Sequence, residues 1–162
     1  MVSIRQMDYV TYPEPRHEEV KCLAKGTYKG YDFYILSMSG SHPCAYIDTK
    51  DVGEKLELDE DSWGFPVHGG ITYARTYLNG YVEDSWVIGW DYGHFGDKTW
   101  TDNYGEEHKT YDILLEVFEA INHMKDMWKE HQEKGLRDLM ATIAGLQEEA
   151  TEKINKVKEE LQ

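Results

Sequence analysis

Four polar residues in the middle of the chain have the types and spacing to do chemistry. Asp91, His94 and Asp97 follow one another at intervals of three residues, and His68 lies in a second glycine-containing segment. Two carboxylates and two imidazoles could bind a divalent metal ion, with Asp91, His94 and Asp97 as the ligands, and a metal-bound water is a nucleophile near neutral pH. Without a metal, the same four residues could form an acid–base pair in which a carboxylate orients His94.

The glycines beside these residues leave a structural alternative open. Segments 67–73 and 89–97 each place a histidine among glycines and aromatic residues, which indicates tight turns or a close approach of two backbones. In that interpretation, Asp91 and Asp97 accept hydrogen bonds from backbone NH groups of a turn, and the histidines are structural residues. No complete signature of a serine hydrolase, a P-loop or a dinucleotide-binding loop accompanies them.

The hydropathy pattern predicts the elements that must position these residues. Alternating or continuous apolar runs predict about five strands, at 19–24, 31–38, 44–48, 65–73 and 85–90. A helix is predicted over 110–134, because apolar residues recur there at three- and four-residue spacing: Leu114, Val117, Phe118, Ile121, Met124 and Trp128. The expected fold class is therefore α+β, an antiparallel sheet of about five strands packed against a long helix.

The segment after Gly135 has a different pattern. Its apolar residues follow heptad spacing with one four-residue step: Leu136, Leu139, Ile143, Leu146, Ala150, Ile154, Val157 and Leu161. This predicts a coiled-coil-like helical tail that either folds back on the preceding helix or, as we favour, forms a homo-oligomer through residues 136–161. The expected organisation is an extended arm at 1–16, an α+β domain at 17–134 and an oligomerisation tail at 135–162.

The charge of the chain restricts its partners. A formal net charge of −14 over 162 residues disfavours direct binding to nucleic-acid phosphates and to anionic membranes. It favours a basic partner protein, and the candidate contact surface is the acidic loop with its tryptophan: Glu54, Glu57, Asp59, Glu60, Asp61 and Trp63. The lack of a long apolar run or signal peptide predicts a cytoplasmic protein. In that compartment Cys22 and Cys44 are expected to be separate thiols.

The two glycine-histidine segments also carry a resemblance. They resemble motifs of small phage and prophage proteins from Gram-positive bacteria, in which His-Gly-Gly-Leu/Ile-Thr-Tyr precedes Gly-Phe/Trp-Asp-x-x-His-x-Gly-Asp. The matching residues here are His68, Gly69, Gly70, Ile71, Thr72, Tyr73, Gly89, Trp90, Asp91, His94, Gly96 and Asp97. The family has no agreed function, but small acidic phage proteins often act against host defences.

Three hypotheses for function follow. The first is a phage-encoded inhibitor that binds the nucleic-acid groove of a host defence protein, a CRISPR effector such as a Cas9-type nuclease, in the infected bacterial cell. The second is an enzyme, a metal-dependent or histidine-dependent nuclease or phosphodiesterase that acts on guide RNA or a nucleotide signal. The third is a structural dimer in phage assembly, organised by the helical tail.

Overall fold

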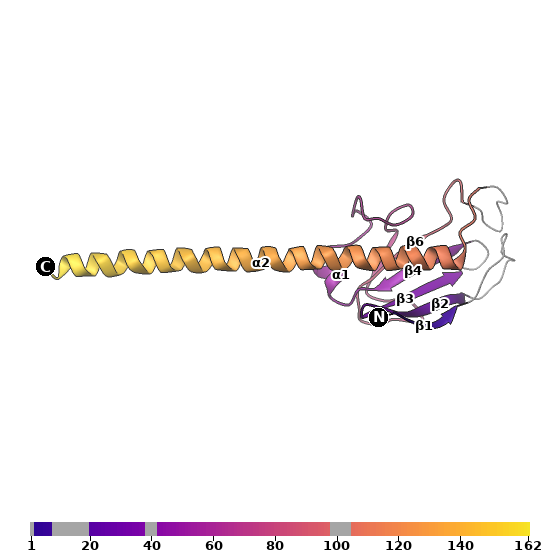
Figure 1. Ribbon diagram of the computed structural model, residues 1–162, viewed down its shortest axis with the longest axis horizontal. Helices are drawn as coiled ribbons and strands as arrows, with labels where there is room; N and C mark the ends of the chain where they lie inside the picture. Colours follow the sequence, from indigo (N-terminus) through magenta and orange to yellow (C-terminus); the bar gives the residue numbers. More distant parts are fainter. Residues whose placement is uncertain (1, 8–19, 38–41, 98–104) are drawn as a thin grey trace. The chain divides into compact units, whose positions relative to one another are not determined.

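The computed structural model describes residues 2–7, 20–37, 42–97 and 105–162. It confirms an α+β fold with an open, antiparallel six-stranded sheet and a long C-terminal helix (Figure 1). The chain divides into two compact units, a body at Met1–Lys125 and a helical segment at Asp126–Gln162. In the part of the chain that is described, no helix has both the length and the apolar character needed to span a membrane.

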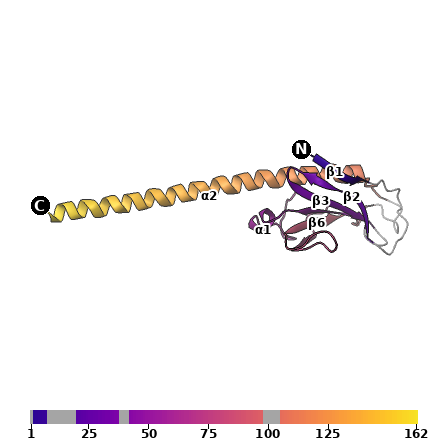
Figure 2. The same ribbon diagram turned by 90° about the horizontal axis from the view of Figure 1, so that it is seen from below.

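The sheet has the strand order β1-β2-β3-β4-β6-β5, and every pair of neighbours is antiparallel. Strands β1, β2, β3 and β6 are labelled in both views of the sheet (Figures 1 and 2). The strands and the short helix of the body are β1 Val2–Met7, β2 Lys21–Tyr28, β3 Tyr31–Ser37, β4 Pro43–Asp48, α1 Val52–Lys55, β5 Tyr73–Arg75 and β6 Val87–Asp91. A two-residue turn joins β2 to β3, with φ of 48° at Lys29 and 86° at Gly30. Positive φ at both turn residues matches the twist of a hairpin.

Both faces of the sheet are covered, which explains why its central strands are apolar on both sides. In β3, Phe33 and Ile35 alternate with Tyr34 and Leu36, and all four are buried. Tyr34 and Leu36 belong to a hydrophobic cluster that also includes Leu78 from the loop after β5. The ring of Phe33 meets α2 instead, so the core has one layer on each side of the sheet.

Helix α2, Thr110–Glu160, begins in the body. Its buried residues all precede Asp126 and recur at helical spacing: Thr110, Ile113, Leu114, Val117, Ala120, Ile121 and Met124. Its Phe118 ring stacks on Tyr28 with centroids 4.4 Å apart and meets Phe33 edge-on at 5.7 Å. The predicted apolar stripe therefore packs on the sheet, apart from its last member, Trp128, which belongs to the helical segment.

The structure differs from the sequence-based expectations in three places. Val2–Met7, expected to be part of an arm outside the domain, pairs with β2 as edge strand β1, while the rest of that arm lies outside the described residues. Residues 65–72 are a loop rather than a strand, because glycines with φ of 71° and 82° at Gly69 and Gly70 turn the chain there. Helix α2 continues through Gly135 without a turn.

The two cysteines lie on either side of β3. Cys22 in β2 and Cys44 in β4 both pair with Leu36 of the strand between them. Adjacent strands are about 4.8 Å apart, so the two Cα atoms are separated by about 10 Å, well beyond the span of a disulfide. Both residues are thiols, as predicted, and Cys44 is buried.

Candidate functional site

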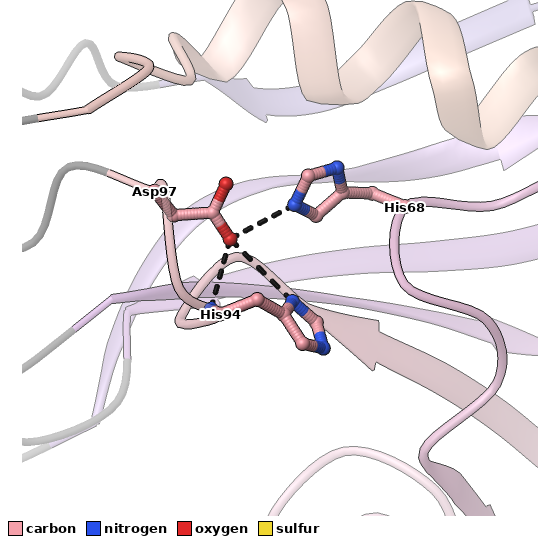
Figure 3. Close-up of side chains that lie close together, drawn as sticks. All are labelled: His68, His94 and Asp97. Carbon is pink, nitrogen blue, oxygen red and sulfur yellow. Dashed lines mark hydrogen bonds and ion pairs between the residues drawn. The ribbon is translucent and has the colours of Figure 1, made fainter.

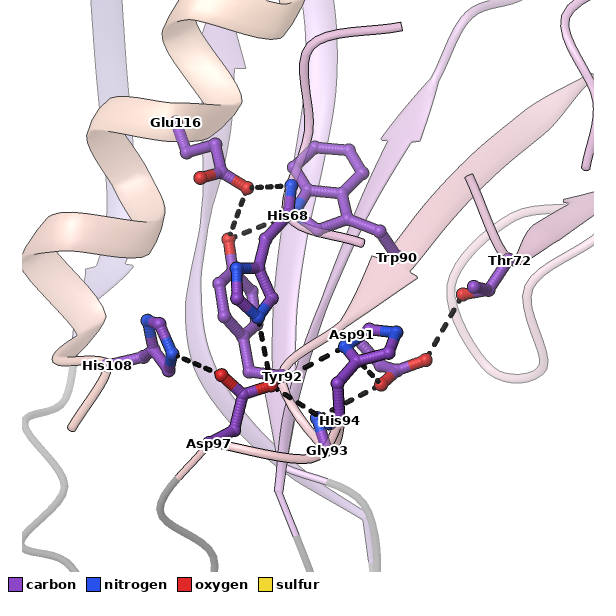
Figure 4. Close-up of polar contacts among 10 residues, drawn as sticks. All are labelled: His68, Thr72, Trp90, Asp91, Tyr92, Gly93, His94, Asp97, His108 and Glu116. Atoms are coloured by element: carbon purple, nitrogen blue, oxygen red, sulfur yellow. Dashed lines mark hydrogen bonds and ion pairs between the residues drawn. The ribbon is translucent and has the colours of Figure 1, made fainter. Parts of the chain in front are cut away.

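The pairing of β5 with β6 brings two turns together at one end of the sheet. The strands run antiparallel with Tyr73 opposite Gly89, so the residues before β5 lie beside the residues after β6. The backbone NH of Thr72 donates to the carbonyl of Gly89 across 2.9 Å. The turn that carries His68 and the turn that carries His94 therefore share one site (Figure 4).

Asp97 is the centre of this site, and its side chain is only 4% exposed. His68 Nε2 donates to its Oδ2 oxygen across 2.8 Å, and His108 Nε2 donates to its Oδ1 oxygen across 2.7 Å (Figures 3 and 4). The backbone NH of His94 also donates to Oδ2, across 2.9 Å. Because an ionised carboxylate only accepts hydrogen bonds, both of these imidazoles carry a proton on Nε2.

The environment of Asp97 favours its charged form. Burial acts to raise the pKa of Asp97, but hydrogen bonds from His68, the backbone NH of His94 and His108 outweigh it, and the pKa lies below its usual value. The carboxylate is therefore a fixed negative charge in a largely enclosed site. Such a charge orients neighbouring imidazoles and attracts a cation.

The imidazole of His94 lies between two carboxylates. Its Nδ1 atom is 3.4 Å from Asp97 Oδ2 and 3.6 Å from Asp91 Oδ1, and it is buried with no hydrogen-bond partner among the described residues. In a tetrahedral site with metal–ligand bonds of about 2.1 Å, neighbouring ligand atoms are about 3.4 Å apart. The separations around Nδ1 therefore match those between metal ligands better than those of hydrogen bonds.

One atom each from His68, His94 and Asp97 gives a set of potential metal ligands within 4.8 Å of one another (Figure 3). Imidazole nitrogen and carboxylate oxygen suit zinc and similar divalent transition metals. His108 binds the other oxygen of Asp97, which is the place of an outer-shell partner that fixes a ligand's orientation. These residues fit a divalent cation that takes the place of the proton on His68 Nε2, because a ring nitrogen must be unprotonated to bind a metal.

A buried hydrogen-bond network supports the site from the side of α2. The Trp90 indole NH donates to the Tyr92 hydroxyl, which in turn donates to Glu116 Oε1, each across 2.9 Å. The same Glu116 oxygen accepts the backbone NH of His68 across 2.8 Å. The His68 ring stacks on the Tyr92 ring with centroids 4.9 Å apart and planes 9° apart. Both the position and the ring plane of His68 are thus fixed (Figure 4).

Two glycines allow the imidazoles to approach the backbone. A Cβ atom at Gly69 would lie 2.4 Å from Cε1 of His94, and a Cβ atom at Gly93 would lie 2.6 Å from Nδ1 of His42. Neither glycine could carry a side chain without displacing a ring. Partial burial lowers the pKa of His42 and outweighs the opposing influence of Asp91, so this fourth histidine favours its neutral form.

The structure brings all four predicted residues, His68, Asp91, His94 and Asp97, to one site. The alternative in which these carboxylates stabilise turns also describes part of the arrangement. Asp91 accepts a hydrogen bond from the backbone NH of Gly93 across 3.0 Å, and Asp97 accepts one from the backbone NH of His94. The metal-ligand role of Asp91 stays a prediction.

Sequence reasoning missed two residues of the site. His108 lies in a polar loop without any periodic pattern. Glu116 could have been suspected, since it is a carboxylate beside the apolar stripe of a predicted helix and is only partly exposed.

The predicted contact surface lies outside this network, on helix α1, which carries Glu54, and on the loop that follows it, so the acidic segment expected to be a loop is helical in part. Four of its acidic residues, Glu54, Glu57, Glu60 and Asp61, are exposed, and Asp59 is partly buried. The indole of Trp63 is 94% exposed. An exposed tryptophan beside several carboxylates is typical of a protein-binding surface.

Comparison with known proteins does not assign this chain to a family. No family model, curated protein or solved structure matches this chain.

Proposed function

We propose that the protein binds a divalent transition metal ion through His68, His94 and Asp97 and uses it in a hydrolytic reaction. The observation that carries this proposal is the buried Nδ1 atom of His94, which lies near two carboxylates but forms no hydrogen bond with any described residue. A cation at this place would give that nitrogen a partner and would offset the charges of the carboxylates.

The chemistry of the donor set indicates hydrolysis. A divalent ion with three protein ligands keeps a position for water and lowers the pKa of that water to about 7. The side chain of His94 is 37% exposed and that of His68 is 27% exposed, so a small substrate can reach the site. Among the substrates expected from the sequence, a small nucleotide phosphodiester suits the acidic chain better than a nucleic-acid polymer does.

Cobalt titration tests the metal site. We expect stoichiometric Co²⁺ binding with visible absorption bands, displaced by Zn²⁺, and at least tenfold weaker binding by His94→Ala. The matched control is His131→Ala, which removes an exposed histidine of the helical segment and should bind Co²⁺ like the native protein. Equal binding by His94→Ala, or no binding by the native protein, would refute the site. Hydrolysis of bis(p-nitrophenyl) phosphate by the metal-loaded protein then tests the reaction.

A second candidate function rests on a different observation, the 94% exposed indole of Trp63 beside exposed carboxylates. This surface supports the counter-defence hypothesis, in which an acidic inhibitor of a phage occupies the basic nucleic-acid groove of a CRISPR effector such as a Cas9-type nuclease. Trp63 would be the anchor in such a complex, and the surrounding charges would speed the encounter.

A cleavage assay with purified nuclease, guide RNA and target DNA tests the second candidate. The triple variant Glu54→Lys, Glu57→Lys, Asp61→Lys should lose inhibition. Its control, Glu130→Lys, Glu133→Lys, Asp138→Lys, changes the net charge equally at exposed sites of the helical segment and should inhibit like the native protein. Inhibition that survives in the loop variant, or native protein that never inhibits, would reject this candidate.

A further inference from the structure

The helical segment leaves a long apolar stripe uncovered. Every residue from 129 to 162 is exposed, including large apolar side chains with exposures of 46% to 82%: Leu136, Leu139, Met140, Ile143, Leu146, Ile154, Val157 and Leu161. In water, a helix of this length with a continuous apolar stripe gains most of its stability from packing against a partner. The spacing and the charges along the stripe indicate what that partner is.

The spacing of the stripe is palindromic. The stripe positions Leu139, Ile143, Leu146, Ala150, Ile154, Val157 and Leu161 are separated by steps of 4, 3, 4, 4, 3 and 4, with Ala150 at the middle. Met140 lies beside this row of positions. The pattern therefore reads the same in both directions. The single departure from heptad spacing, a second step of four, lies at that midpoint.

A second copy of the same helix, running antiparallel with its Ala150 opposite Ala150, matches this pattern throughout. It places Leu146 opposite Ile154, Ile143 opposite Val157, and Leu139 opposite Leu161, with every pair formed twice because of the two-fold symmetry. The small side chain of Ala150 occupies the axis, where two identical residues meet. A partner helix with an unbroken heptad repeat would lose this match on one side of Ala150.

The charges beside the stripe favour the antiparallel orientation. Glu149 and Lys153 flank the stripe and form an ion pair with each other across 3.1 Å. In the antiparallel arrangement, Glu149 of one copy lies near Lys153 of the other, on both sides of the axis. In a parallel, in-register arrangement, Lys153 of one copy would lie near Lys158 of the other, and these like charges repel.

We infer that the stripe is covered by a second copy of this chain, in an antiparallel two-helix coiled coil whose two-fold axis passes through Ala150. This inference is independent of the proposed function. It uses residues 139–161 as a self-complementary surface, the arrangement that closes a symmetric dimer.

Sedimentation equilibrium of the full chain tests whether a dimer forms. We expect twice the chain mass of 18.9 kDa. Leu146→Glu should weaken association at least tenfold, because it buries two unpaired charges. Ala141→Glu introduces the same group at an exposed position outside the stripe and should leave the dimer intact. A mass of one chain, or of more than two, would overturn the inference.

Cysteine cross-linking tests the orientation. Under mild oxidation, Ala150→Cys should form a disulfide-linked dimer, whereas Leu161→Cys should not. In the antiparallel pair, two residues at position 161 are about 33 Å apart, from 1.5 Å per residue on each side of the axis. The native chain, treated in the same way, gives the background from its own thiols. Rapid cross-linking of Leu161→Cys would show a parallel pair and overturn the inference.

Charge variants give opposite signs for the two orientations. Lys153→Glu should weaken an antiparallel dimer, since it faces Glu149 of the partner, but it would strengthen a parallel one by facing Lys158. The double variant Glu149→Lys, Lys153→Glu should restore the antiparallel dimer. Lys156→Glu, with the same charge change on the side away from the stripe, is the control. Tighter association of Lys153→Glu than of this control would contradict the antiparallel arrangement.

Discussion

The body and the helical segment of this chain hold their structure in opposite ways. In the body, one carboxylate connects residues from three separate stretches: Asp97, His68 and His108. In the helical segment, side-chain contacts join residues three or four positions apart, as in the ion pair of Lys153 with Glu149. Changes in the body should therefore spread through many contacts, whereas changes in the helical segment should have local and nearly additive effects. The following variants test that difference.

Asp97→Ala should have the largest effect. It leaves the Nε2–H groups of His68 and His108 and the backbone NH of His94 without their acceptor in a buried place. We expect the free energy of unfolding of the body to fall by about 3 to 5 kcal/mol. Urea denaturation followed by tryptophan fluorescence measures it. Asp126→Ala, an exposed carboxylate at the start of the helical segment, should cost under about 0.5 kcal/mol. Equal losses for the two variants would mean that Asp97 is no structural centre.

Gly69→Ala should have the second-largest effect, and Gly70→Ala is its matched control. Both glycines have positive φ, 71° at Gly69 and 82° at Gly70, so an alanine costs about 1 kcal/mol of backbone strain at either. Only at Gly69 would the new Cβ meet His94, at 2.4 Å, while at Gly70 it finds no described atom within 4 Å. We expect Gly69→Ala to lose about 1 to 2 kcal/mol more than Gly70→Ala, and to lose Co²⁺ binding as well. Thermal unfolding measures the loss of stability, and cobalt titration measures the loss of Co²⁺ binding. Equal stability and equal Co²⁺ binding of the two variants would contradict the close approach of His94 to Gly69.

The pH dependence of stability should reveal the charge on Asp97. Its folded pKa lies below its usual value, so its ionised form stabilises the body at all pH values above the unfolded pKa of about 3.9. That contribution is lost as the pH falls through the lower, folded pKa. The difference in unfolding free energy between the native protein and Asp97→Asn should therefore narrow below about pH 4. Urea titrations between pH 7 and pH 2 measure this difference. If the difference in unfolding free energy stays constant over that range, the charge on Asp97 does not contribute to stability.

Gly135→Ala should have the smallest effect and the opposite sign. Its added Cβ has no described atom within 4 Å, and the helix already continues through this position. Alanine should stabilise the helical segment by about 1 kcal/mol, because it loses less backbone entropy than glycine. Circular dichroism during heating measures the gain. Gly145→Ala should gain a similar amount, and neither variant should alter Co²⁺ binding. A loss of stability at Gly135 would mean that the position needs a glycine.

These contrasts also explain what the sequence could predict. The stripe of α2 and the strands β3, β4 and β6 were predictable, because periodic burial leaves a periodic pattern. The meeting of His68 with His94 and Asp97 was predictable in part, because both turns carry glycines at the ends of apolar runs.

The remaining features depend on contacts that leave no local pattern. His108 lies in a polar stretch of sequence without periodicity, so nothing in the sequence indicated that it would contact Asp97. Strand β1 was missed because its alternation is limited to Val2-Ser3-Ile4-Arg5, a run too short to distinguish a strand from an arm, and both apolar residues of that run are exposed. Residues 65–72 have apolar side chains typical of a strand, but positive φ at Gly69 and Gly70 turns the chain there.

The placement of the cysteines has a practical consequence. Cys22 and Cys44 are held apart by the full width of β3, so an oxidant cannot join them while the sheet is intact. Burial also raises the pKa of the Cys44 thiol to about 12, which keeps it protonated and slow to react with alkylating reagents. The body should therefore form no internal disulfide in oxidising media. A thiol-reactive fluorescent or spin label, directed at a new cysteine on the helical segment, should therefore leave Cys44 unmodified.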